Sequence, residues 1–188
     1  MPTPIADSVR LARERLQDVL KAFMPTVIDD LAVEYPDHRL IAPERWFRCR
    51  PLPDRMMRLW RQNNIDEVAG FVYREGRAQT LADYSGDGSI TTRTVILPFR
   101  VALFVQWGGG FTPADGEIED EWQADRIELY RGAMTDILTM HARDNESVKE
   151  VSIAGFDSDV LTTPQDQLGL MSYAMIDLEV FQDISIKR

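Results

Sequence analysis

The stretch Ser89–Trp107 reads SITTRTVILPFRVALFVQW and is the most informative part of this chain. From its middle onward every second residue is apolar, whereas the alternate positions mix threonine, proline, arginine and glutamine with a few apolar residues. This period of two predicts a β-strand with one side against a core. The apolar side comprises Val95, Leu97, Phe99, Val101, Leu103, Val105 and Trp107. Such a strand has about three times the usual length, so we expect it to serve assembly as well as folding.

Pro98 interrupts the strand pattern near its centre. Proline lacks a backbone N–H and cannot donate to a sheet ladder. We therefore expect an edge position, a bulge or a bend at Pro98. The apolar segments Val95–Leu97 and Phe99–Trp107 then form two parts of one bent strand, and either end can project towards a neighbouring subunit.

The rest of the sequence predicts a single α+β domain over residues 1–188, with a largely antiparallel mixed sheet. Its N-terminal part, residues 5–35, is helical: an amphipathic helix runs to Phe23, Pro25 stops it, and Thr26 caps a shorter continuation. Residues 36–66 form an insertion rich in proline and arginine. We expect a short strand near Trp46–Arg50 and a short helix over Asp54–Gln62 within it.

Residues 67–107 form a hairpin that ends in the long strand, with a first strand over Glu67–Arg77 and a turn-rich connection around Ser85–Ser89. A long helix follows over residues 117–142, with acidic residues in its first turns as the helix dipole favours. A closing hairpin occupies residues 148–184. Its strands are predicted near Val148–Phe156 and Gly169–Ile184, joined by a long loop, Asp157–Leu168.

Composition predicts a soluble, intracellular protein. The chain has 188 residues, of which 44% are hydrophobic, enough for one domain with a real core. Its N-terminus lacks the apolar stretch of a signal peptide, and no window is apolar for the roughly 18 residues of a membrane span. The single cysteine, Cys49, excludes an internal disulfide and fits a reducing compartment.

Charge is distributed unevenly along the chain. The segment 45–61 carries six arginines and one acid, whereas the whole chain has a net charge of −10. An acidic protein is a poor general DNA binder, because phosphate neutralisation supplies most non-specific affinity. A basic patch on an acidic body can instead contact the acidic surface of another copy; a solvated surface and a nucleic-acid contact remain alternatives. The candidate subunit-contact residues are Arg45, Arg48, Arg50, Arg55, Arg58 and Arg61.

No catalytic motif is present in the sequence, and we expect no enzyme activity and no cofactor. Cys49 and Arg55 have the C-x5-R spacing of phosphatase loops, but Pro51 and Pro53 remove backbone donors that would cradle a phosphate. Neither histidine, His38 or His141, lies in a recognisable catalytic context.

A weak metal-site candidate lies in the turn before the long strand. Asp83, Ser85 and Asp87 occupy the first, third and fifth positions of a calcium-loop pattern, with Gly88 at the sharp turn. Thr94 stands where a bidentate glutamate is expected, and a strand follows instead of a helix. Because Gly, Asp and Ser also favour ordinary turns, a metal at these residues is unlikely, although a small calcium- or ligand-binding domain stays an alternative.

The order of these elements resembles the tail terminator and related neck proteins of long-tailed bacteriophages. The resemblance rests on the N-terminal helix, the hairpin ending in Thr91–Trp107, the helix Glu117–Ala142 and the closing hairpin Val148–Ile184. Members of that family are small α+β subunits that form hexameric rings. It implies a virion structural protein of the tail or neck, assembled in the host cytoplasm, whose homo-oligomeric ring caps the tail tube and joins it to the head connector. Residues 42–61 and the length of the chain depart from the simplest members.

Several features of the residues agree with a ring. Ring contacts are heterologous, so one patch of a subunit must bind a different patch of the next. The arginine segment and the acidic remainder of the chain are two such patches, of opposite charge. The long strand and the hairpin offer edges for pairing between subunits. An acidic lumen would let DNA pass without specific binding. On this hypothesis Asp157, Asp159 and Asp166 face the lumen or the tube end; the alternative for these residues is an ordinary solvated loop. For the protein as a whole, other neck, head-completion, tube or baseplate roles remain alternatives.

Overall fold

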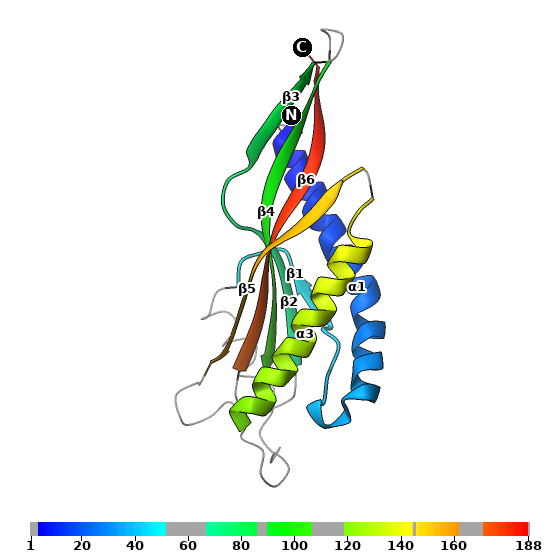
Figure 1. The fold of residues 1–188 in the computed structure, drawn as a ribbon, viewed down its shortest axis with the longest axis vertical. Coiled ribbons are helices and arrows are strands. Elements are labelled where there is room, and N and C mark those ends of the chain that lie inside the picture. Colours follow the sequence, from blue (N-terminus) through cyan, green and yellow to red (C-terminus); the bar gives the residue numbers. More distant parts are fainter. Residues whose placement is uncertain are drawn as a thin grey trace.

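The computed structural model describes residues 4–51, 67–85, 90–106, 119–144, 146–161 and 171–187 (Figure 1). The elements in chain order are α1 (Pro4–Glu34), the 3₁₀ turn η1 (Pro36–His38), β1 (Arg45–Phe47), β2 (Glu67–Arg74), β3 (Gln79–Ser85), β4 (Ile90–Gln106), α3 (Glu119–His141), β5 (Glu150–Leu161) and β6 (Met171–Lys187). The predicted helix over Asp54–Gln62 lies outside the described residues. In the described part of the chain, no helix is long and apolar enough to cross a membrane.

The strands form one mixed, largely antiparallel sheet, as the sequence predicts. The strand order is β1-β2-β4-β6-β5, and β3 pairs with β4 beside β2. Among the described strands, β1 and β2 run parallel and the other pairs are antiparallel. The predicted long strand is confirmed as β4, whose 17 residues pair with β6 in one unbroken register from Ile90↔Lys187 to Gln106↔Met171.

Both helices pack on the same face of this sheet and cover the main core. From the strands, the apolar side of β4 predicted from the sequence is buried there together with alternate residues of β6, such as Ile176 and Leu178. The helices contribute fully buried side chains to the same core, among them Leu16, Leu20 and Met134. Since strand side chains alternate between the two faces, the remaining residues of β4 and β6 lie on the opposite face. Neither α1 nor α3 packs on this face, and because these are the helices of the described residues it is here called the helix-free face.

The helix-free face divides into an apolar part and a polar part. Ala69, Phe71, Tyr73, Ala102 and Phe104 form a second buried cluster on β2 and β4, with Phe47, Tyr173 and Met175 packed against it. Further along β4 and β6, Arg100, Asp177 and Glu179 occupy the same face because they share its alternation. The apolar part therefore lies at the end of the sheet that carries β1.

Pro98 lies where β4 changes neighbours. Pairing with β2 ends at Arg74↔Phe99, and pairing with β3 begins at Gln79↔Ile96. The Pro98 carbonyl accepts the Glu75 N–H at 3.0 Å, so its nitrogen also points to this side of the strand. Because the missing N–H falls at the junction of β2 and β3, β4 continues past the proline without breaking its ladder with β6.

The prediction that Pro25 stops the first helix is wrong, since α1 continues through it to Glu34. A proline in a helix leaves the carbonyl four residues earlier without its donor, and here that residue, Lys21, is exposed, so water can replace the bond. On the opposite side Met24 and Ile28 are fully buried on the sheet. Packing before and after Pro25 therefore keeps the helix in one piece.

Two strand boundaries also differ from prediction. The predicted strand over Glu67–Arg77 ends at Arg74, and residues 79–85 form β3, a strand that the sequence did not predict before the turn-rich connection expected around Ser85–Ser89. Residues 157–161, expected in a loop, belong to β5, because pairing with β6 overrides their polar composition. The long helix is confirmed as α3, within about two residues at each end.

Three side chains of α3 fasten the segment between α1 and β1. Trp122 Nε1 donates to the Asp37 carbonyl at 3.0 Å, and Arg126 donates to the Arg39 carbonyl at 2.8 Å. The Tyr130 hydroxyl donates to the Ile41 carbonyl and accepts the Ile41 N–H, both at 2.8 Å. The i, i+4, i+8 spacing places the three on one helix stripe, which fixes the path of the chain into β1.

Candidate functional site

One end of the sheet narrows to three strands. The Lys149 N–H donates to the Phe181 carbonyl at 2.9 Å, and beyond this point β5 no longer accompanies β6. Residues 182–187 of β6, residues 90–96 of β4 and β3 form what we call the ribbon. Figure 1 shows it extending past the end of α3, with the N-terminal half of α1 behind it. Within the described residues, no strand pairs with the outer side of β3 or of β6 in the ribbon.

The backbone groups on these two edges follow from the register. Phe181 directs its carbonyl towards β5, so Asp183, Ser185 and Lys187 direct their N–H and C=O groups the same way, into the open edge. On β3, Tyr84 and Ala82 pair with the β4 residues that point to that strand, so Asp83 and Ser85 direct their backbone groups outward. Each edge thus presents, in alternation, donors and acceptors that no strand of the described residues pairs with.

The described candidate arginines lie in β1 and just after it. Arg45 lies in β1, and Arg48 and Arg50 follow it; all three are exposed, and the other three candidates lie outside the described residues. Arg48 is already engaged within the chain: it pairs with Glu14 at 3.1 Å and donates to Gln17 Oε1 at 2.5 Å. Its first role is to hold the end of β1 on α1.

Two of the candidate lumen residues, Asp157 and Asp159, lie in β5, so the prediction that they belong to a loop is wrong. Asp157 is exposed and pairs with Met175, which places it on the helix-free face. Asp166 lies outside the described residues. Three acids that the sequence argument missed, Asp177, Glu179 and Asp183, share this face of β6; their alternation with buried residues was the signal.

Asp177, one of these acids, is neutralised by an arginine of β4. The Arg100 guanidinium binds Asp177 through two hydrogen bonds, of 2.5 and 3.0 Å. The hydrogen bond to Asp177 raises the pKa of Arg100 above its ordinary value. Burial raises the pKa of Tyr73, next to this pair, while the charge of Arg100 opposes the rise. The pair separates the apolar part of the helix-free face from the acidic part.

The first part of the calcium-loop candidate forms an extended strand instead of a loop. Asp83 and Ser85 belong to β3 and pair with Arg93 and Thr91 of β4, whereas Asp87 lies outside the described residues. In an extended strand, residues two apart are separated by about 7 Å, so the chain does not wrap around an ion at these two positions. No cluster of His, Cys, Asp or Glu suited to a metal occurs among the residues that the structure describes.

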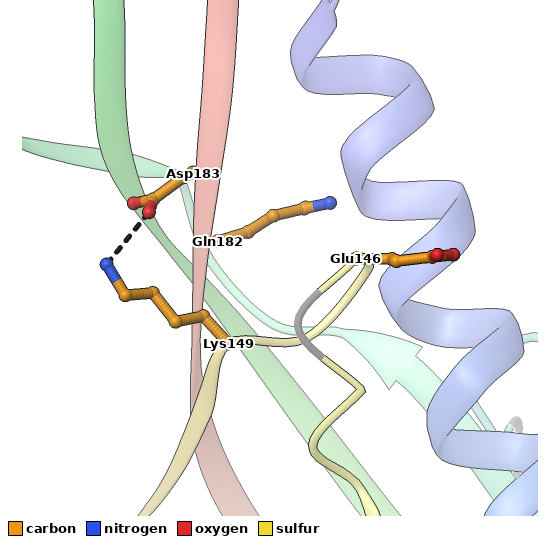
Figure 2. A pocket seen from close by; sticks show the side chains of 4 residues that line it. All are labelled: Glu146, Lys149, Gln182 and Asp183. Carbon is orange, nitrogen blue, oxygen red and sulfur yellow. Dashed lines mark hydrogen bonds and ion pairs between the residues drawn. The ribbon is translucent and has the colours of Figure 1, made fainter.

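A polar hollow of about 230 Å³ lies where β5 leaves β6. Figure 2 shows Lys149 and Asp183 bound to each other on one side of β6, while Gln182 extends towards α1. The Lys149–Asp183 distance is 2.8 Å, and the Thr94 hydroxyl donates to Asp183 at 2.6 Å. The hydrogen bond from Lys149, followed by that from Thr94, lowers the pKa of Asp183. These contacts tie β4, β6 and the start of β5 together, and so mark where the open edge begins.

Comparison with protein-family models and with curated proteins finds no match.

Proposed function

We propose that this chain is a virion structural protein, the tail terminator of a long-tailed phage, whose ring caps the tail tube and receives the head connector. The observation that carries the proposal is the ribbon, with an open backbone edge on each side. A strand edge of this kind is a template for pairing with another chain. Two different edges on one chain favour a heterologous contact, which closes into a ring when the rotation allows.

The charge of the helix-free face supports the same role. Asp157 of β5 and Glu179 and Asp183 of β6 all lie on this face. Asp183 forms an ion pair with Lys149. In a ring whose helices face outward, this face lines the lumen. A negative lumen repels the phosphate backbone, so DNA passes through without specific binding.

The test is the size and shape of the purified protein. Light scattering at working concentration measures the oligomer, alone and after mixing with tail tube subunits of the same virus. Electron micrographs of the same samples show whether particles have a central hole, and whether tubes carry a cap at one end. A strictly monomeric protein under both conditions contradicts the proposal.

Another neck, head-completion or tail structural role remains the alternative, since such subunits use small α+β folds too. It predicts oligomers that bind the connector or the baseplate while leaving tube ends uncapped. The calcium-binding alternative is weakened by the extended geometry of Asp83 and Ser85 in β3. Calorimetric titration with calcium tests it directly, because binding to the folded state gives heat and raises the melting temperature.

A further inference from the structure

We propose that the subunit contact is a parallel strand pairing, in which the open β6 edge of one copy binds the open β3 edge of the next. This inference rests on the proposed ring function and names the surface that closes the ring. The two edges are the outer sides of the ribbon, and within the described residues no strand of the same chain pairs with either.

The direction of pairing follows from the sheet itself. Both β3 and β6 are antiparallel to β4, so they run in the same direction within one copy. When the strands lie roughly along the axis of a ring, rotation keeps this direction in every copy. The β6 edge of one subunit therefore meets the β3 edge of its neighbour in parallel.

The outward-facing backbone groups of the two edges interlock. In a parallel ladder, each bonded residue of one strand lies between two bonded residues of the other. With Ser185 opposite Tyr84, Asp83 falls between Asp183 and Ser185, and Ser85 between Ser185 and Lys187. This register forms about four backbone hydrogen bonds. It requires no backbone group that is already used in pairing with β4.

The features at the base of the ribbon suit this contact. The Lys149 N–H holds the backbone at the start of β5 on β6 at Phe181, and the Lys149 side chain reaches Asp183 beyond it. Beyond it β6 has no bulge, since its register with β4 is unbroken to Lys187. Natural edges are usually blunted by bulges, by charges or by cover. β5 has a register shift at Ile153–Gly155, and β3 has one at Thr80–Ala82, before the residues Asp83 and Ser85 that make this contact. The β6 edge of the ribbon has the regular geometry that strand addition needs.

A continuous sheet around the ring gives the lumen its wall. Six copies with three ribbon strands each supply about eighteen strands, a number at which closed barrels leave a water-filled channel. With α1 on the outer face, the wall presents the helix-free face, including Thr94 and Asp183, to the lumen.

Cysteine cross-linking tests the contact. Tyr84 and Ser185 both pair with Thr92 from opposite sides, so within one copy their Cα atoms are about 10 Å apart, two strand spacings. A disulfide needs Cα atoms closer than about 7 Å, and the pair can therefore bridge only between copies. In a Cys49→Ser background, Tyr84→Cys with Ser185→Cys should give a covalent ladder up to the closed ring on non-reducing electrophoresis.

A second pair guards against a variant that fails to fold. Ala82 and Asp183 both pair with Thr94, so Ala82→Cys with Asp183→Cys is subject to the same distance limit and should give the same ladder. Each cysteine alone should give no ladder. As a matched control, Arg45→Cys with Ser158→Cys places cysteines on the other outer strands, β1 and β5, and should not cross-link.

The outcomes separate this inference from the proposed function. Rings in light scattering without a ladder from either edge pair overturn the strand contact and leave the ring function standing. A ladder from the β1 and β5 control alone also overturns it. Covalent dimers from single cysteines show that an edge pairs with its own copy, which contradicts the heterologous contact. Monomers under all conditions contradict the proposed function itself.

Discussion

Tyr130→Phe removes one oxygen from the core and should destabilise the chain measurably. The ring of Tyr130 is fully buried, and its hydroxyl binds both the N–H and the C=O of Ile41 at 2.8 Å. Phenylalanine keeps the packing of the ring, so the loss reports these two bonds. Leaving a buried polar group without a partner costs about 1–3 kcal/mol. Ile41 is only partly buried, so water satisfies part of the loss, and we expect about 2–3 kcal/mol in total.

The assay is urea unfolding followed by circular dichroism, with thermal melting as a second measure. For a chain of this size the expected loss corresponds to a fall of about 5–10 °C in the melting temperature. Tyr35→Phe is the matched control, because Tyr35 is exposed and its substitution should stay within about 0.5 kcal/mol. Amide hydrogen exchange at Ile41 should accelerate only in Tyr130→Phe. If the two variants unfold alike, the Tyr130 hydroxyl does not hold this segment.

Four further substitutions test other parts of the structure. Ser185→Pro removes an N–H that points to the open β6 edge, so light scattering should show loss of rings while circular dichroism stays native; intact rings would contradict the edge contact. Gly70→Ala places a Cβ 2.3 Å from Trp46 Cε3 and should lower the free energy of unfolding by about 1–3 kcal/mol in urea. Gly132→Ala, whose Cβ meets nothing within 4 Å, should raise it by about 0.5–1 kcal/mol; equal effects would refute the overlap. In Asp144, partial burial alone would raise the pKa, but bonds from Ser147, Val148 and Glu146 together lower it. Its stabilisation is therefore present above the unfolded pKa of about 3.9 and lost as pH falls through the lower folded value, so Asp144→Asn should flatten the acid limb of a stability–pH curve.

The sequence predicts the long strand and the long helix because both signals are local. The alternation from Val95 to Val105 predicts one buried face, and this face is the main core. The helix over residues 117–142 is likewise confirmed as α3. Pro98 was expected to need an edge, a bulge or a bend, and the register shows how one strand accommodates it: its nitrogen faces the junction between β2 and β3.

The surroundings of the candidate site residues could not be predicted, because they depend on contacts between segments far apart in the sequence. Asp157 and Asp159 read as loop residues, yet pairing with β6 extends β5 through them. Arg48 reads as a surface charge, yet Glu14 and Gln17 bind it across the fold. Asp83 and Ser85 of β3 read as turn residues, because aspartate and serine favour turns when no neighbouring strand is considered.

The sequence alone therefore determines an α+β chain with an overlong strand and an uneven charge, because periodicity and composition are properties of neighbouring residues. Only the tertiary structure decides which edges stay open. Strand edges are defined by the absence of a neighbour, and the neighbours of β4 and β6 come from distant parts of the chain. β5 begins beside Phe181, whose carbonyl accepts the Lys149 N–H, and β3 replaces β2 where Pro98 cannot donate. The ribbon, and the assembly that we propose for it, follow from those long-range pairings.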